Sequence, residues 1–152
     1  FYVSGAELSS QKKYSKKINS IFKNSNLNKN NYKYYGMIDN VPSFLAGANI
    51  FVCTSVTEAG PMTVWEAMSM GKAVVTTNVG AVSQYIKNGV SGFIVPIADT
   101  KALANCVYEL IQDPELTERI GKNARKVALE KLDVNIAAEK YAKFYNKVFH
   151  NN

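Results

Sequence analysis

Two glutamates, Glu58 and Glu66, are the residues in this chain best suited to chemistry, and they lie on either side of a Gly-Pro turn. Glu58 lies in a loop, and Glu66 falls in the second turn of a helix expected from about Met62 to Met70. Ionised carboxylates accept strong hydrogen bonds, and the hydroxyls of a sugar are suitable donors. The pair therefore indicates a site for hydroxyl groups. The alternative is a plain helix-start acid and a solvent-facing helix residue.

Gly60 and Pro61, between the two glutamates, predict an anion site at the start of that helix. Glycine lets the backbone come close to a ligand, and proline suits the first turn of a helix. The N–H groups of Met62, Thr63 and Val64 are then expected to have no partner within the helix and to point outward at its positive end. This arrangement favours a phosphate group.

The elements around this turn alternate between short apolar runs and amphipathic segments. Strands are expected at 1–4, 32–35, 49–53, 73–77 and 92–95, and helices at 8–24, 40–46, 62–70 and 81–87. Three helices then follow, and the apolar stripe of the last one is Ala137, Tyr141, Phe144, Tyr145 and Val148. The alternation predicts an α/β fold in one domain, 1–152, with a parallel sheet covered by helices. Ligands bind such sheets beyond the carboxyl ends of the strands, so the expected site loops are 5–8, 36–41, 53–62, 76–82 and 95–99.

Charge and composition describe an ordinary globular chain with one basic segment. The 152 residues carry a formal net charge of +6, and 47% of them are hydrophobic. Residues 1–38 hold seven lysines and one glutamate, whereas residues 39–152 hold eleven basic and eleven acidic residues. The lysines are expected on the solvent face of the helix at 8–24, with a membrane-surface or polyanion patch as the alternative. No apolar run is long enough for a transmembrane helix, and no interleaving of basic and aromatic residues indicates nucleic acid.

Several common catalytic groups lack the residues they need. The only histidine is His150, near the end of the sequence, which argues against Ser-His-Asp and Cys-His catalysis. Cys53 and Cys106 form neither a disulfide framework nor a zinc motif, so a reducing, cytoplasmic setting is expected. There is no glycine-rich dinucleotide motif, no phosphate loop and no Asp-x-Asp pair for a divalent metal. We therefore expect no metal and no cofactor.

Several motifs, spaced in the right order, resemble those of the retaining family 4 glycosyltransferases. They are Tyr35-Gly36-Met37, Ala48-Asn49-Ile-Phe-Val, Glu58 to Glu66 with Ala67-Met68, Gly71-Lys72-Ala-Val-Val, Gly80, Asn88-Gly-Val-Ser-Gly-Phe-Ile-Val-Pro with Asp99, and Ala102-Leu103-Ala104. The resemblance covers almost the whole chain. It implies the Rossmann-like C-terminal half of a GT-B glycosyltransferase, which ends in a helical tail.

The resemblance also implies a role for each candidate residue. Such enzymes, here of the hexosyltransferase type, take a sugar from a nucleotide-diphosphate sugar, a UDP- or GDP-sugar, with retention of configuration and without a metal. Glu58 would be catalytic, binding the donor-sugar hydroxyls near the reacting carbon, and Glu66 would bind the ribose hydroxyls. The amides from Gly60 to Val64 would hold the sugar and the pyrophosphate, and Met37 would offer its backbone to the base. Gly5, at the end of the first strand, is a further candidate for donor binding.

The sequence departs from the family pattern at several positions. Gly60 stands where an aromatic residue is common, and Ala73 and Ala81 stand where Pro and Gly are usual. The pyrophosphate-binding Arg and Lys, the first strand and the acceptor domain are all expected upstream of Phe1. The sheet is therefore expected to show a gap, an altered strand order or a strand borrowed from a neighbour. The chain alone is expected to be inactive, since the glycan or lipid acceptor would bind the upstream domain.

Two other functions stay open at this stage. A sugar-nucleotide epimerase has the same architecture, although the Glu-Ala-Met pattern disfavours it. A non-catalytic domain that binds nucleotide sugars is the second alternative. The setting is expected to be cytoplasmic, with peripheral contact on the inner face of the membrane as an option for the lysine-rich segment.

Overall fold

The computed structural model describes residues 1–5, 12–25 and 31–150. The chain divides into two compact units, Phe1–Phe44 and Leu45–Asn152. The expectation of one domain over 1–152 stays a prediction. Among the described residues, no helix is both long enough and apolar enough to cross a membrane.

The first unit is small and mostly exposed. It holds β1 (Tyr2–Val3), α1 (Lys12–Asn24), β2 (Lys33–Tyr34) and most of α2 (Val41–Ala46). β1 and β2 pair in parallel, and the rings of Tyr2, Tyr35 and Phe44 meet edge to face. The lysines of α1 are all exposed, as predicted for a solvated helix face. The expected residues 8–11 of that helix lie outside the described residues, and no described residue before Leu45 is buried.

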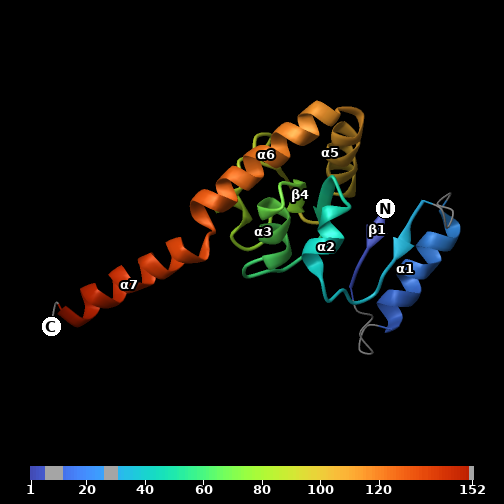
Figure 1. The fold of residues 1–152 in the computed structure, drawn as a ribbon. Helices are drawn as coiled ribbons and strands as arrows, with labels where there is room; N and C mark the ends of the chain where they lie inside the picture. The colour runs from blue at the N-terminus through green and yellow to red at the C-terminus, as the bar shows by residue number, and fades with distance from the viewer. Residues whose placement is uncertain (6–11, 26–30, 151–152) are drawn as a thin grey trace. The chain divides into compact units, whose positions relative to one another are not determined.

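The second unit carries the core of the protein. Its elements are β3 (Ile50–Cys53), α3 (Met62–Ser69), β4 (Ala73–Thr77), α4 (Val82–Tyr85), β5 (Phe93–Val95), α5 (Thr100–Gln112), α6 (Pro114–Lys131) and α7 (Val134–His150). The three strands are parallel, in the order β3-β4-β5. β4 is central, and all five of its residues are buried, as its run of β-branched residues predicts. Figure 1 shows α3, α5 and α6 gathered around this strand, and each of them contacts it.

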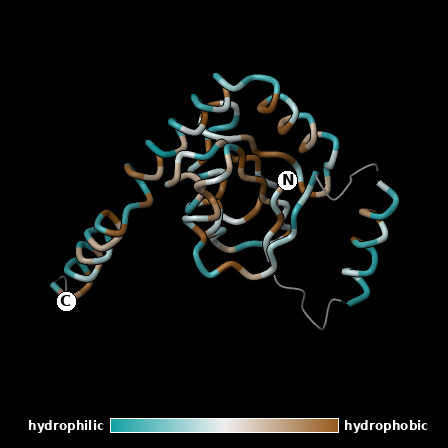
Figure 2. Tube along the Cα trace, turned by 45° about the vertical axis from the view of Figure 1, so that its right-hand side comes forward, coloured by the Kyte–Doolittle hydropathy of each residue, from teal (hydrophilic) through white to brown (hydrophobic). Residues whose placement is uncertain are grey.

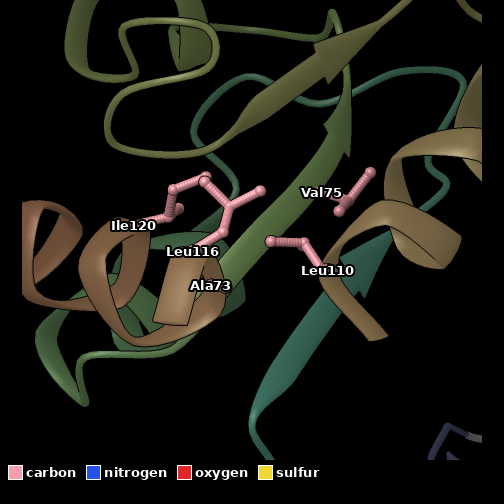
Figure 3. Close-up of a cluster of buried hydrophobic side chains, with 5 residues drawn as sticks. All are labelled: Ala73, Val75, Leu110, Leu116 and Ile120. Carbon is pink, nitrogen blue, oxygen red and sulfur yellow. The ribbon is translucent and has the colours of Figure 1, made fainter. Parts of the chain in front are cut away.

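One apolar cluster joins β4 to the two long helices. It comprises Ala73 and Val75 of β4, Leu110 of α5, and Leu116 and Ile120 of α6, whose side chains meet in Figure 3. On α3 the buried residues are Val64, Ala67 and Met68, the apolar face that the spacing predicts. Burial of a Val, Leu or Ile side chain contributes about 1.5–3 kcal/mol, so this cluster holds β4 against α5 and α6.

Local signals in the sequence define where these helices begin and end. Asp113 caps α6 by accepting from the N–H of Leu116 at 2.9 Å, as the Asp-Pro pair predicts. Gly71 has a φ of +69° and ends α3. Its N–H donates to the carbonyl of Met68, and that of Lys72 donates to the carbonyl of Ala67. These two bonds form a Schellman motif, which satisfies the last carbonyls of the helix.

One expectation about the fold needs correction. In the described part of the chain the strands form two separate parallel sheets, β1-β2 and β3-β4-β5, rather than one. The apolar stripe of the last helix is exposed: α7 buries none of its described residues, and Tyr141 and Phe144 are 64% and 61% exposed. Figure 2 shows hydrophobic and hydrophilic residues alternating along α7.

Candidate functional site

Glu58 is held in place by a short chain of hydrogen bonds from the ends of β3 and β4. The hydroxyl of Ser55 donates to Oε1 of Glu58 at 2.8 Å. Ser55 is itself held, because the hydroxyl of Thr77 donates to its carbonyl at 2.6 Å. The thiol of Cys53 also lies 3.6 Å from the Ser55 oxygen. Glu58 is half-buried, so one carboxylate oxygen is oriented by the protein while solvent or a ligand can reach the group.

Gly80, in the turn after β4, fits closely against the loop that carries Glu58. Its φ of +50° lies in the left-handed region. A Cβ at this position would lie 2.5 Å from the carbonyl oxygen of Ala59 and 2.7 Å from that of Glu58. Only glycine therefore allows this approach. The turn after β4 and the loop after β3 thus lie side by side at the carboxyl edge of the sheet, as predicted for a ligand site.

The start of α3 leaves backbone donors free beside this loop. No hydrogen bond engages the N–H groups of Met62 and Thr63 within the described residues. The expectation for Val64 was wrong, because its N–H donates to the carbonyl of Pro61 at 2.9 Å. Pro61 has a ψ of 86°, which turns its carbonyl toward the first helical turn. Two amides at the positive end of the helix, rather than three, are thus available to an anion.

Glu66 lies one turn further along α3 than these amides. It is half-buried, and its carboxylate has no hydrogen bond or ion pair within the described residues. The preceding residue, Trp65, packs edge to face on Tyr85 of α4, with ring centroids 5.0 Å apart. This aromatic pair fixes α3 against α4, so Glu66 lies on a rigid helix with its acceptor oxygens unused.

Gly5 and Met37 belong to the first unit. The N–H of Gly5 donates to the carbonyl of Gly36 at 2.8 Å, and its carbonyl accepts from the hydroxyl of Tyr34. Gly5 and Gly36 have positive φ values, so both turns need glycine. Met37 follows directly and is 75% exposed. The structure brings these two loops together, whereas their participation in one site with Glu58 stays a prediction.

Ser55 and Gly80 contact Glu58 or its loop in ways that the sequence alone did not predict. Ser55 follows β3 by two residues and begins the segment that leads to Glu58, but its local pattern does not predict that its hydroxyl donates to Glu58. Gly80 belongs to one of the motifs that resemble the family. Its contact with Glu58 joins residues 22 positions apart in the sequence, which a local pattern does not reveal.

The charged chemistry of the site rests on carboxylates and amides. Within the described residues, no group of three or more His, Cys, Asp or Glu side chains could hold a metal ion. Outside this site, on α5, burial raises the pKa of the Cys106 thiol, and the nearby charge of Glu109 raises it further.

Comparison with known proteins identifies the family. Residues 2–127 match the family described as glycosyl transferases group 1. The chain belongs to this family. Its motifs around Glu58 and Glu66 therefore lie within a glycosyltransferase domain, as the resemblance implied.

Individual relatives agree with this assignment. The chain is 32% identical over 125 residues to an N,N'-diacetylbacillosaminyl-diphospho-undecaprenol alpha-1,3-N-acetylgalactosaminyltransferase of Campylobacter jejuni, covering 82% of this chain and 33% of the relative. It is 36% identical over 104 residues to the capsular polysaccharide biosynthesis glycosyltransferase CapM of Staphylococcus aureus, covering 68% of this chain and 27% of the relative. The crystal structure of Anabaena HepE in complex with UDP and glucose has a TM-score of 0.88 and 26% identity, covering 96% of this chain and 40% of that chain.

The chain spans about a third or less of the curated relatives it matches. The GT-B type of fold that was expected is confirmed by the solved glycosyltransferases of similar structure. The names of the relatives favour a glycosyltransferase over the epimerase and the non-catalytic domain.

Proposed function

We propose that this chain is the donor-binding domain of a retaining family 4 glycosyltransferase. Its substrate is a nucleotide-diphosphate sugar with UDP or GDP as the nucleotide, and no metal takes part. The observation that carries the proposal is the orientation of Glu58 by Ser55 beside the free amides of Met62 and Thr63. The crystal structures of the similar protein HepE with UDP and with UDP-glucose support the choice of ligand.

Glu58 acts on the donor sugar. When the bond to the leaving phosphate lengthens, the sugar ring gains positive charge, and a nearby carboxylate interacts more strongly with that charge than with the neutral ground state. Ser55 occupies one oxygen of Glu58, which leaves the other for the hydroxyls of the sugar. Gly80 holds the loop in register with the sheet edge, because nothing larger fits against the carbonyls of Glu58 and Ala59.

The start of α3 stabilises the leaving group. Two backbone N–H groups, those of Met62 and Thr63, donate to the pyrophosphate at the positive end of the helix. Both residues are exposed, so a ligand reaches them. These donors stabilise the negative charge that the departing phosphate gains, and no metal is needed for that role.

Glu66 binds the nucleotide. Its carboxylate accepts from the ribose hydroxyls, which do not change during the reaction. An interaction of this kind stabilises the ground state and the transition state equally, so it sets affinity rather than turnover. The acceptor, a glycan or lipid, is bound by a part of the protein outside this chain, and the chain alone binds the donor without transferring it.

Calorimetric titration of the protein with UDP and with GDP tests this function. We expect saturable binding of one nucleotide, weakened about 10- to 150-fold by Glu66→Gln, the effect of losing one charge-assisted hydrogen bond. Glu139→Gln is the matched control, because Glu139 is exposed on α7, and it should leave the affinity unchanged. Absence of binding to both nucleotides, or equal losses in the two variants, would contradict the proposal.

A further inference from the structure

A cleft of about 620 Å³ lies at the edge of the sheet opposite Glu58. Its walls come from the start of β3, the turn before β4, the end of α5 and one face of α6. Glu58 and the start of α3 are at the carboxyl ends of β3 and β4, whereas Ile50 and Lys72 of the cleft are at the amino ends. None of the residues proposed to bind the donor lines it, so the cleft is separate from that site.

The cleft carries excess positive charge. Lys72, Lys122 and Arg125 line it together with one acidic residue, Glu118. Nζ of Lys122 lies 2.6 Å from a carboxylate oxygen of Glu118, so these two charges offset each other. Nζ of Lys72 donates to the carbonyl of Ala46 at 3.3 Å. Within the described residues neither Lys72 nor Arg125 is paired with a carboxylate.

The walls of the cleft are held by close backbone contacts. Gly121 of α6 packs against the carbonyl of Gly71, and any Cβ at position 121 would overlap that oxygen. The hydroxyl of Thr117 donates to the carbonyl of Leu110 at 2.6 Å, which ties α6 to the end of α5. The side-chain stem of Arg125 lies 3.8 Å from the Cβ position of Gly71. The base of the Arg125 side chain therefore lies against the turn at Gly71.

The floor of the cleft is apolar. Ile50, Leu110 and Ile111 contribute to it, and the side chain of Ile111 is 53% exposed although it is large and hydrophobic. The volume falls in the range of sites for small molecules, about 300–1,000 Å³. A guanidinium donates two parallel hydrogen bonds to a phosphate. The combination fits a ligand with an anionic head and an apolar body.

We propose that this cleft is a second ligand site, which binds a phosphate monoester or diester whose phosphate contacts Arg125 and Lys72 and whose body lies on Ile50 and Ile111. The ligand is either a soluble phosphoester or the headgroup of an anionic lipid, since both present the same chemistry. The site does not depend on the proposed donor-binding function, because it shares no residue with it.

The test is a titration of the ¹⁵N-labelled protein, followed by NMR, with n-octyl phosphate below its micelle-forming concentration. The amide signals of Gly71 and Gly121 report on the cleft, and those of Gly60 and Gly80 report on the opposite edge. We expect saturable shifts at Gly71 and Gly121 only, with n-octyl glucoside as the uncharged control producing none. Shifts that do not saturate, or shifts confined to Gly60 and Gly80, would overturn the proposal.

Variants that remove a positive charge inside or outside the cleft separate a specific site from general charge. Arg125→Gln and Lys72→Gln should each weaken binding about tenfold or more, whereas Arg119→Gln, on the same helix but outside the cleft, should leave it unchanged. Equal losses for Arg119→Gln and Arg125→Gln would overturn the proposal. Binding to vesicles of phosphatidylglycerol and phosphatidylcholine, compared with binding of inorganic phosphate, shows whether the ligand is a lipid headgroup or a soluble phosphoester. Vesicle binding that Arg125→Gln and Lys72→Gln weaken but Arg119→Gln does not supports a lipid headgroup, and binding of inorganic phosphate but not of vesicles supports a soluble phosphoester.

Discussion

Replacing Gly80 by Ala should destabilise the protein for two reasons, the positive φ of this position and the contact of the new Cβ with the loop of Glu58. The added Cβ would lie 2.5 Å from the carbonyl oxygen of Ala59, whereas ordinary contact begins at about 3.4 Å, so the two atoms must separate by about 0.9 Å. Both neighbours are backbone atoms, so no flexible side chain can give way. Overpacking of this kind costs about 1–3 kcal/mol, in addition to about 1 kcal/mol for a left-handed alanine.

Gly89 provides a matched control for this substitution. It has a φ of +73°, similar in sign to that of Gly80, but nothing lies within 4 Å of the Cβ position. Gly89→Ala should therefore lower the free energy of unfolding by about 1 kcal/mol, and Gly80→Ala by about 2–4 kcal/mol. With a slope of about 2 kcal/mol per molar urea, the two midpoints should differ by about 1 M.

Gly80→Ala should also affect activity more than Gly89→Ala. A displacement of about 1 Å in a catalytic group can lower turnover on the order of 100-fold. We expect such a loss in the full-length transferase with Gly80→Ala and none with Gly89→Ala, measured as the rate of sugar transfer at saturating donor. If the two variants unfolded at the same urea concentration and transferred sugar at the same rate, Gly80 would not lie close to the carbonyls of Glu58 and Ala59, and the prediction would be wrong.

Three further predictions concern individual side chains. Ser55→Ala should lower turnover about 10-fold through loss of the hydrogen bond that orients Glu58, while UDP affinity measured by calorimetry stays the same; a change confined to affinity would argue against this positioning role. In steady-state kinetics with varied donor, Glu58→Gln should lower turnover about 10- to 1,000-fold and Glu66→Gln should raise the Michaelis constant with turnover preserved; the opposite pattern would reverse the two assignments. Alkylation of Cys106 by iodoacetamide should be slower at pH 7.5 than that of a free cysteine and should increase as the pH rises, because burial and Glu109 raise the pKa of the thiol; a rate equal to that of free cysteine would contradict the raised pKa.

Local structure in this protein follows from local sequence. The five β-branched and small residues at 73–77 predict the central strand, and Asp113 with Pro114 predicts the start of α6. Gly71 predicts the end of α3 for a steric reason, since the Schellman motif needs a positive φ at that position. Each of these signals acts within a few residues, so it can be recognised without knowledge of the tertiary fold.

Contacts between distant segments could not be predicted in this way. Gly80 meets Glu58, and Gly121 meets Gly71, only because the sheet and α6 bring them together. The number of free amides at the start of α3 depended on ψ of Pro61, a loop angle that no periodicity specifies. The stripe on α7 shows a related limit, since spacing predicts that a helix face is apolar but not what covers it.

The most direct test of the proposed donor site is an NMR titration of the ¹⁵N-labelled protein with UDP. The account predicts saturable shifts at the amides of Gly60, Met62 and Thr63, because the pyrophosphate accepts hydrogen bonds from the start of α3. Gly71 and Gly121, at the opposite edge of the sheet, should be unaffected at the same concentrations. Saturable shifts at Gly71 and Gly121 with none at Met62 and Thr63 would contradict the account, since the nucleotide would then bind away from both glutamates.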